Sequence, residues 1–124
     1  MRRLLGAVCI GFGMANALAC NCFPPELRAK TAQEALDKST LAAMAQVQAV
    51  DASQTARLVV LESFKGLAPQ STFEAAQDLE QCGAMRLAVG EKWLFISFKD
   101  KVTACDKHPS EHYMVEEFRK MKAQ

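Results

Sequence analysis

Two cysteines separated by a single residue, Cys20 and Cys22, follow directly on an apolar N-terminal run, and this arrangement restricts the folds open to the chain. The run begins after a positively charged start, contains no charge and ends in Ala17-Leu18-Ala19, which fits the small-x-small rule for signal peptidase. This is the three-part pattern of a secretory signal peptide, and the run is too short for a comfortable membrane span. We therefore expect residues 1–19 to be a signal peptide and the mature domain, residues 20–124, to be secreted or periplasmic.

A lipoprotein signal also ends just before a cysteine, so a lipid anchor at Cys20 is an alternative to plain cleavage after Ala19. Such signals usually carry leucine three residues before the cysteine, followed by small residues. Here that place holds Ala17, and the bulky Leu18 comes next. The pattern favours plain cleavage, which leaves Cys20 as the first residue with a free α-amino group.

The composition of the mature chain narrows the class of partner. Removal of 19 of the 124 residues leaves 105, enough for one small domain. Arg2 and Arg3 leave with the signal, so the 15 Lys and Arg residues fall to 13 against 14 Asp and Glu, a formal net charge of −1. A nearly neutral chain without a basic run argues against nucleic acid and against an anionic membrane surface. No second apolar run of membrane length follows, so we expect no membrane span.

Four of the five cysteines remain after cleavage: Cys20, Cys22, Cys82 and Cys105. An even number of cysteines in a small exported domain predicts two disulfides. Four cysteines allow three pairings, and joining Cys20 to Cys22 would close a very tight ring. Two pairings stay open, and each ties the N-terminus to two distant points. A bridge that closes so long a loop contributes ~4 kcal/mol in the chain-entropy model.

The sequence predicts a short helix followed by five short strands. Thr31 to Glu34 has the spacing of a capping box and predicts the start of the helix, after an extended Phe23-Pro24-Pro25. Trp93 and Phe95 could line a ligand-binding face of their strand, but core packing is the better interpretation. Apolar and β-branched patterns predict the strands over residues 41–50, 54–64, 72–76, 92–98 and 102–105.

A second helix is predicted at the end of the chain. Ser110 is a good N-cap. Met114, Phe118 and Met121 then recur at helical spacing and form one apolar stripe, beside a favourable pair of Glu116 and Lys120. Five short strands and two flanking helices predict a small β-barrel with the helices packed outside it.

Catalytic and metal-binding patterns are weak. No catalytic dyad, glycine-rich phosphate loop or nucleophile elbow occurs, and a C-x-x-C before a helix is missing, so we expect no enzyme and no cofactor of its own. Cys105, His108 and His112 have a metal-like spacing. Pro109 lies between the histidines, however, and Cys105 is expected in a disulfide. We therefore expect solvated histidines at the start of the last helix.

The order of several sequence pieces resembles that of the tissue inhibitors of metalloproteinases and the wider netrin-like domains. The pieces are the Cys-x-Cys at the mature N-terminus, then QEALDKSTLAAMAQV, LESFKG and CGAMRLAVGEKWLFIS. Their order and rough spacing match over nearly all of residues 20–124. The resemblance implies an OB-fold-like five-stranded β-barrel with helices against it, and the disulfides Cys20–Cys82 and Cys22–Cys105.

The chain also departs from these inhibitors. They have a third bridge in this domain, with a cysteine at the end of the first helix, where Asp37 stands here. The animal inhibitors carry a second, cysteine-rich domain that this sequence does not contain. Their second residue is usually Thr or Ser, whereas here it is Asn21. The last difference bears on the class of target.

The resemblance implies that the mature N-terminus inhibits zinc metalloproteases. The α-amino group of Cys20 has a pKa near ~8, so a usable fraction is neutral at physiological pH. Its nitrogen and the Cys20 carbonyl oxygen could chelate the protease zinc and displace the water that this metal activates. Asn21 would enter the pocket beside the metal, and Glu80 and Gln81 would lie alongside. We call Cys20, Asn21, Cys22, Glu80 and Gln81 the inhibitory tip; the zinc belongs to the target.

Two other functions are compatible with the cysteine pattern. One is a non-inhibitory netrin-like module for protein binding or assembly, in which Cys20 and Cys22 only staple a small exported barrel. The other is a Cu(I)-binding or redox protein, in which the two reduced thiols are soft ligands. No methionine or histidine cluster flanks the two cysteines, and Cys82 and Cys105 offer disulfide partners, which argues against copper.

Overall fold

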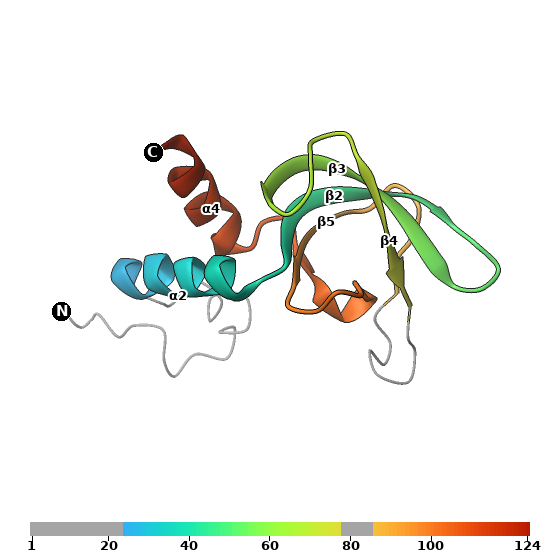
Figure 1. The fold of residues 1–124 in the computed structure, drawn as a ribbon, viewed down its shortest axis with the longest axis horizontal. Helices are drawn as coiled ribbons and strands as arrows, with labels where there is room; N and C mark the ends of the chain where they lie inside the picture. The colour runs from blue at the N-terminus through green and yellow to red at the C-terminus, as the bar shows by residue number, and fades with distance from the viewer. Residues whose placement is uncertain (1–23, 78–85) are drawn as a thin grey trace, which may run out of the picture.

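The computed structural model describes residues 24–77 and 86–124. The elements run in the order α2 (Pro25–Lys38), β2 (Leu41–Val50), β3 (Thr55–Lys65), β4 (Thr72–Ala76), β5 (Lys92–Ser97), η1 (Ala104–Asp106), β6 (Lys107–Pro109) and α4 (Tyr113–Ala123). Figure 1 shows the strands as one curled sheet, with α2 and α4 on one side of it. The domain is therefore mainly β with two flanking helices, as the sequence predicts.

The five-stranded sheet is antiparallel, with its strands in the order β4-β3-β2-β5-β6. The described residues do not close it into the expected barrel, because β4 and β6 remain the two edge strands. One isolated parallel bridge, between Ala76 and Thr103, joins the end of β4 to the chain before η1. We call the gap between the rest of the β4 edge and residues 100–102 the seam.

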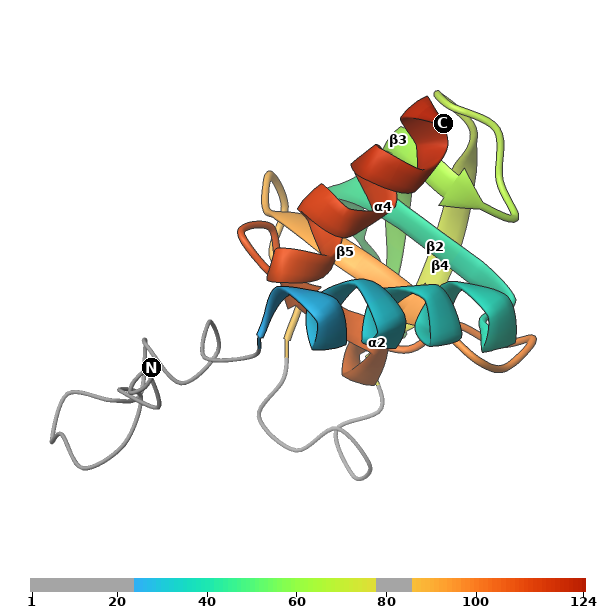
Figure 2. The same ribbon diagram turned by 90° about the vertical axis from the view of Figure 1, so that its left-hand side faces the viewer.

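Each face of the sheet carries its own apolar core. Successive residues of a strand point to opposite faces, so the central strand β2 contributes to both. The inner core fills the curl of the sheet and is formed by Leu41, Ala45, Val47, Ala56, Leu58, Ala75, Leu87, Phe95, Val102 and Ala104. The outer core lies under the helices and is formed by Ala32, Ala42, Met44, Leu94, Ile96, Val115 and Phe118. Figure 2 looks onto the helix layer, where α2 and α4 lie side by side over the sheet.

The first helix begins earlier than the capping-box pattern predicts. It starts at Pro25, and the carbonyl of Pro24 accepts hydrogen bonds from the amides of Leu27 and Arg28 at 2.9 and 3.0 Å. Proline is well suited to the first helical position, since its ring fixes φ and no N–H is needed there. The extended stretch expected over residues 23–25 is therefore wrong at Pro25, and Thr31 lies inside the helix.

The fifth strand also differs from the prediction. Residues 104–106 form the 3-10 turn η1, and β6 follows at Lys107–Pro109. Thr103 and Asp106 form a capping box: the Cys105 amide donates to Thr103 Oγ1, and the Thr103 amide donates to Asp106 Oδ2 at 2.9 Å. This reciprocal cap favours a turn where a strand was expected.

The last helix is capped by His112 rather than by the expected Ser110. The Met114 amide donates to His112 Nδ1 at 3.2 Å. The predicted pair of Glu116 and Lys120 does not form, because each residue instead makes an i,i+3 ion pair, with Arg119 and Glu117 respectively. The apolar stripe of this helix is confirmed: Phe118 is buried in the outer core, and Met114 and Met121 pack against it.

Candidate functional site

The inhibitory tip and Cys82 lie outside the described residues, so the structure bears on the site through the residues that flank it. Pro24 follows the N-terminal part of the tip, and Gln77 and Arg86 bracket the segment with Glu80, Gln81 and Cys82. Cys105 is the one cysteine of the four that falls within 24–77 and 86–124. Hydrogen bonds connect the surroundings of three residues: Gln77 bonds to Leu87, next to Arg86, and Lys107, two residues after Cys105, bonds to Arg86.

Cys105 is exposed and lies in η1, where its amide donates to Thr103 Oγ1 at 3.3 Å. It is disulfide-bonded. No second cysteine belongs to the described residues, so the pairing with Cys22 stays a prediction. The turn itself is held by the capping box of Thr103 and Asp106, which fixes the backbone from which the disulfide departs.

Gln77 fastens the two ends of the segment 78–85 to each other. Its side chain is buried, and Oε1 accepts a hydrogen bond from the Leu87 amide at 2.6 Å. The Gln77 amide in turn donates to the carbonyl of Gln54 at 2.9 Å, which continues the pairing with β3. The segment with the predicted tip residues therefore leaves and re-enters the domain through one buried clamp.

Lys107 forms a second clamp on the same segment. Its Nζ donates to the carbonyl of Arg86 and lies 4.0 Å from the centre of the Trp93 ring. The indole N–H of Trp93 donates to Glu91 Oε1 at 3.0 Å, which orients the ring. Burial lowers the pKa of Lys107, and the charge of Glu91 acts in the opposite direction. Because Lys107 lies two residues after Cys105, the clamp brings Arg86 next to the disulfide-bearing turn.

The predicted roles of the two strand aromatics can be judged directly. Phe95 is fully buried in the inner core and meets Phe73 edge to face, with 5.5 Å between the ring centres. Trp93 is half-buried against the same core and lies under Lys107. Core packing is therefore confirmed for Phe95, and Trp93 serves as a support for Lys107.

His108 and His112 are half-buried, so the expectation of solvated histidines is wrong. Their rings lie 5.2 Å apart, and His112 stacks on Tyr113 at 4.7 Å. Burial lowers the pKa of both imidazoles; the neighbouring His112 lowers that of His108 further, against an opposing effect of Asp106. His112 Nδ1 is engaged by the helix amide, and across residues 24–77 and 86–124 no group of three or more His, Cys, Asp or Glu could hold a metal ion.

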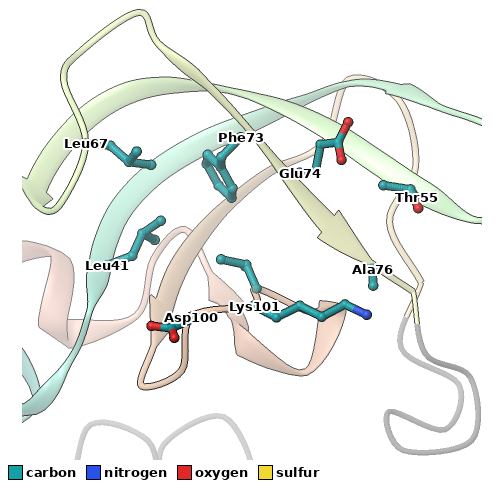
Figure 3. Close-up of a pocket in the computed structure, with 9 residues that line it drawn as sticks. Leu41, Thr55, Leu67, Phe73, Glu74, Ala76, Asp100 and Lys101 are labelled. Carbon is teal, nitrogen blue, oxygen red and sulfur yellow. The ribbon is translucent and has the colours of Figure 1, made fainter.

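Sequence reasoning missed a cleft of about 540 Å³ at the seam (Figure 3). Its apolar lining is Leu41, Leu67, Phe73, Ala76 and Val102, and its polar lining is Thr55, Glu74, Asp100 and Lys101. Figure 3 shows Leu41, Leu67 and Phe73 gathered toward one end, and Lys101 extending toward Ala76. Nothing in the local sequence marks this cleft, because its residues come from β2, β3, β4 and two loops, which only the sheet topology brings together.

Comparisons with models of protein families, with curated proteins and with solved structures found no significant match. Within the described part of the chain, no helix is long and apolar enough to cross a membrane.

Proposed function

We propose that the chain is an exported, netrin-like inhibitor of zinc metalloproteases that acts through the α-amino nitrogen and carbonyl oxygen of Cys20. The observation that carries the proposal is the disulfide at Cys105 together with the Lys107 clamp on Arg86. These contacts tie the exit of the segment with Glu80 and Gln81 to the turn that anchors a cysteine. A tip held in this way would lose little conformational entropy when it binds a protease.

The sheet topology supports the OB-fold-like part of the proposal. OB-folds are five-stranded, partly open Greek-key barrels. The order β4-β3-β2-β5-β6, with a parallel bridge between Ala76 and Thr103 at the open edge, is compatible with such a barrel left open at the seam. The helices lie outside the sheet, where the family resemblance expects them.

The zinc would belong to the target, and this chain would contribute the chelating atoms. The Cys20 amine is neutral in part at physiological pH and can donate its lone pair, while the carbonyl oxygen completes a five-membered chelate. Asn21 would occupy the protease pocket beside the metal. In this scheme the Cys20–Cys82 and Cys22–Cys105 disulfides fix the tip, and the protein resides outside the cytoplasm.

The decisive experiment compares the native exported protein with a version that carries one extra alanine before Cys20. The addition moves the amine by ~3.5 Å, which exceeds the slack of a zinc–nitrogen bond near ~2.1 Å. Both forms are assayed against a panel of zinc endopeptidases, and their urea unfolding midpoints are compared as the folding control. We expect native inhibition and none from the extended form at equal stability.

Equal inhibition by both forms would rule out chelation by the amine. If no zinc endopeptidase responds to the native form, the non-inhibitory binding module takes its place. Carbamylation of the amine offers a second test, since it removes the available lone pair without moving the nitrogen. Intact mass spectrometry of the same samples reports the first residue, any lipid on Cys20 and the number of disulfides. Two free thiols that bind Cu(I) would favour the copper or redox alternative.

A further inference from the structure

The exposed edge of β4 has a defined row of backbone groups. Along β4, odd-numbered residues bond to β3: the Ser71 carbonyl accepts from the Val60 amide, and the Gln77 amide donates to the Gln54 carbonyl. Hydrogen-bonding direction alternates along a strand. The amides and carbonyls of Thr72, Glu74 and Ala76 must therefore point away from β3, toward the seam.

The contact at Ala76 confirms this direction. Its amide crosses the seam and donates to the carbonyl of Val102 at 3.0 Å. An isolated β-bridge between Ala76 and Thr103 lies at this end of the edge. Among the described residues, the outward amides of Thr72 and Glu74 have no backbone partner. The part of β4 from Thr72 to Glu74 thus presents outward backbone groups without a strand partner, beside the cleft.

The cleft supplies room and a side-chain pattern next to that edge. Phe73 points to the inner face with Leu41 and Leu67, whereas Thr72 and Glu74 are exposed on the other face. In an added strand, the residue beside Phe73 would point into the cleft, and its neighbours would point outward beside Thr72 and Glu74.

The opposite wall of the seam is held in place by side-chain hydrogen bonds. Thr40 Oγ1 donates to the carbonyls of Ser97 and Lys99 at 3.1 and 2.7 Å, which fixes the chain that leads to Asp100. Gly66 packs its backbone on the Thr40 carbonyl and so positions the loop with Leu67. The cleft is therefore bounded by anchored segments on both sides.

The charges at the rim select the flanking residues of a ligand. Glu74 and Asp100 are both exposed carboxylates on the cleft, and neither makes an ion pair with a described residue. Lys101 is the one cation in the lining, and it extends along the cleft toward Ala76 (Figure 3). The end of the edge near Glu74 is thus acidic, which favours basic side chains there.

We propose that the seam binds an extended segment of a partner protein, which adds as a strand to the Thr72–Glu74 edge of β4. Its apolar residue enters the cleft against Leu41, Leu67 and Phe73, and the basic residues on either side of it point outward beside Thr72 and Glu74, at the rim that Glu74 and Asp100 make acidic. Backbone hydrogen bonds provide the affinity, and the basic–apolar–basic pattern provides the specificity. The site uses no atom of the inhibitory tip, so it is independent of the proposed function.

The test uses the mature, oxidised protein and a synthetic probe, acetyl-Lys-Val-Lys-Val-Lys-amide. Amide NMR spectra are recorded during titration, and hydrogen exchange is followed with the probe bound. We expect shifts centred on Thr72 and Glu74 and slower exchange of these two amides. A probe with glutamate in place of lysine should bind at least about tenfold more weakly.

Matched variants separate strand addition from simple apolar contact. Thr72→Pro removes the outward amide at the first residue of an edge strand, where proline is tolerated, whereas Thr72→Val removes only the hydroxyl. We expect about tenfold weaker binding by the proline variant and little change for the valine variant. Glu74→Lys should weaken binding, and Lys101→Glu should strengthen it.

Several results would overturn the proposal. Equal binding by the Thr72→Pro and Thr72→Val variants would reduce the site to an apolar cleft without strand addition. Equal binding of the lysine and glutamate probes would remove the charge argument. The absence of any shift would leave the short, charged β4 as an edge that only resists aggregation. Self-association through β4 in sedimentation runs without probe would assign the edge to a second copy of the chain.

Discussion

Gln77 and Leu87, ten residues apart in the chain, are joined by a 2.6 Å hydrogen bond in which the Leu87 amide donates to Gln77 Oε1. Both residues are buried, with 7% and 4% of their surface exposed. We predict that Gln77→Leu lowers the free energy of unfolding by about 1–3 kcal/mol, because it leaves a buried N–H without an acceptor. Urea denaturation followed by circular dichroism measures this loss.

Gln33→Leu is the matched control for that change. Gln33 is exposed and bonds only to Asp37 within α2, so its replacement should alter stability by less than about 0.5 kcal/mol. Similar unfolding midpoints for the two leucine variants would show that the clamp at Gln77 contributes no stability.

Two glycines with the same backbone angle allow a second matched comparison. Gly66 and Gly90 both have φ of 92°, which strains any residue with a Cβ. A Cβ at Gly66 would lie 2.5 Å from the Thr40 carbonyl oxygen, whereas one at Gly90 would meet nothing within 4 Å. We predict a loss of about 1 kcal/mol for Gly90→Ala and a clearly larger loss for Gly66→Ala. Equal melting temperatures of the two variants would contradict the close approach of Gly66 to Thr40.

The outer core predicts a large effect at the last helix. Phe118 is 1% exposed and its ring lies 5.2 Å from that of Phe64. Phe118→Ala should lower the free energy of unfolding by about 3–5 kcal/mol, since it removes a buried aromatic side chain. Phe98→Ala, at a residue that is 54% exposed, should cost far less. An unchanged denaturation midpoint for Phe118→Ala would mean that α4 does not pack on the sheet in solution.

The histidine pair predicts a loss of stability in mild acid. Burial holds the pKa of His108 and His112 below the ordinary value of 6.5, so the unfolded chain binds more protons than the native one as pH falls below that value. Stability should therefore be full above pH 6.5, decline below it, and level off once pH is below the native pKa values. Chemical denaturation between pH 7.5 and about 5.5 measures this decline.

A variant that keeps the helix cap isolates the histidine contribution. His112→Asn preserves an N-cap acceptor for the Met114 amide but does not titrate, and His108→Gln removes the second imidazole. The double variant should lose less stability than the native protein over the same pH interval. An undiminished loss would assign the acid sensitivity to other groups.

The disulfide frame gives a prediction on covalent structure. We expect no free thiol in the mature native protein, and proteolytic peptides that link Cys20 to Cys82 and Cys22 to Cys105. A thiol assay before and after denaturation, followed by mass spectrometry of the digest, checks both statements. Detection of two or more free thiols would contradict the fold and the inhibitor proposals together.

The first four strands were predictable from the sequence, whereas the fifth strand, the helix caps and the closure of the sheet were not. The runs at 41–50 and 72–76 predict β2 and β4 with their observed bounds, because apolar periodicity reports burial directly. The start of α2 at Pro25 and the cap at His112 depended on local backbone choices that several residues could satisfy. Whether the sheet closes depends on long-range registration, which local patterns do not encode.

The candidate site also has a part that was predicted from the sequence and a part that only the structure shows. The inhibitory tip is predicted from the family resemblance, in which the Cys-x-Cys of Cys20 and Cys22 is one of several pieces, and it stays a prediction. The clamps at Gln77 and Lys107 join residues ten and 21 positions apart in the chain. The Lys107 clamp depends on the pairing of β6 with β5, and the Gln77 clamp starts at the end of β4, so local sequence patterns reveal neither.

The central strand β2 forms the shared wall of both cores, and its smallest residues set how closely the two layers approach. Ala42 lies under the helices and Ala45 lies in the curl of the sheet, each with no exposed surface. A larger side chain at either position must be matched by a smaller one across that layer, since packed interiors hold no spare volume. One backbone carries both constraints. A substitution that shifts β2 to suit the packing on the helix side therefore also changes the packing on the seam side.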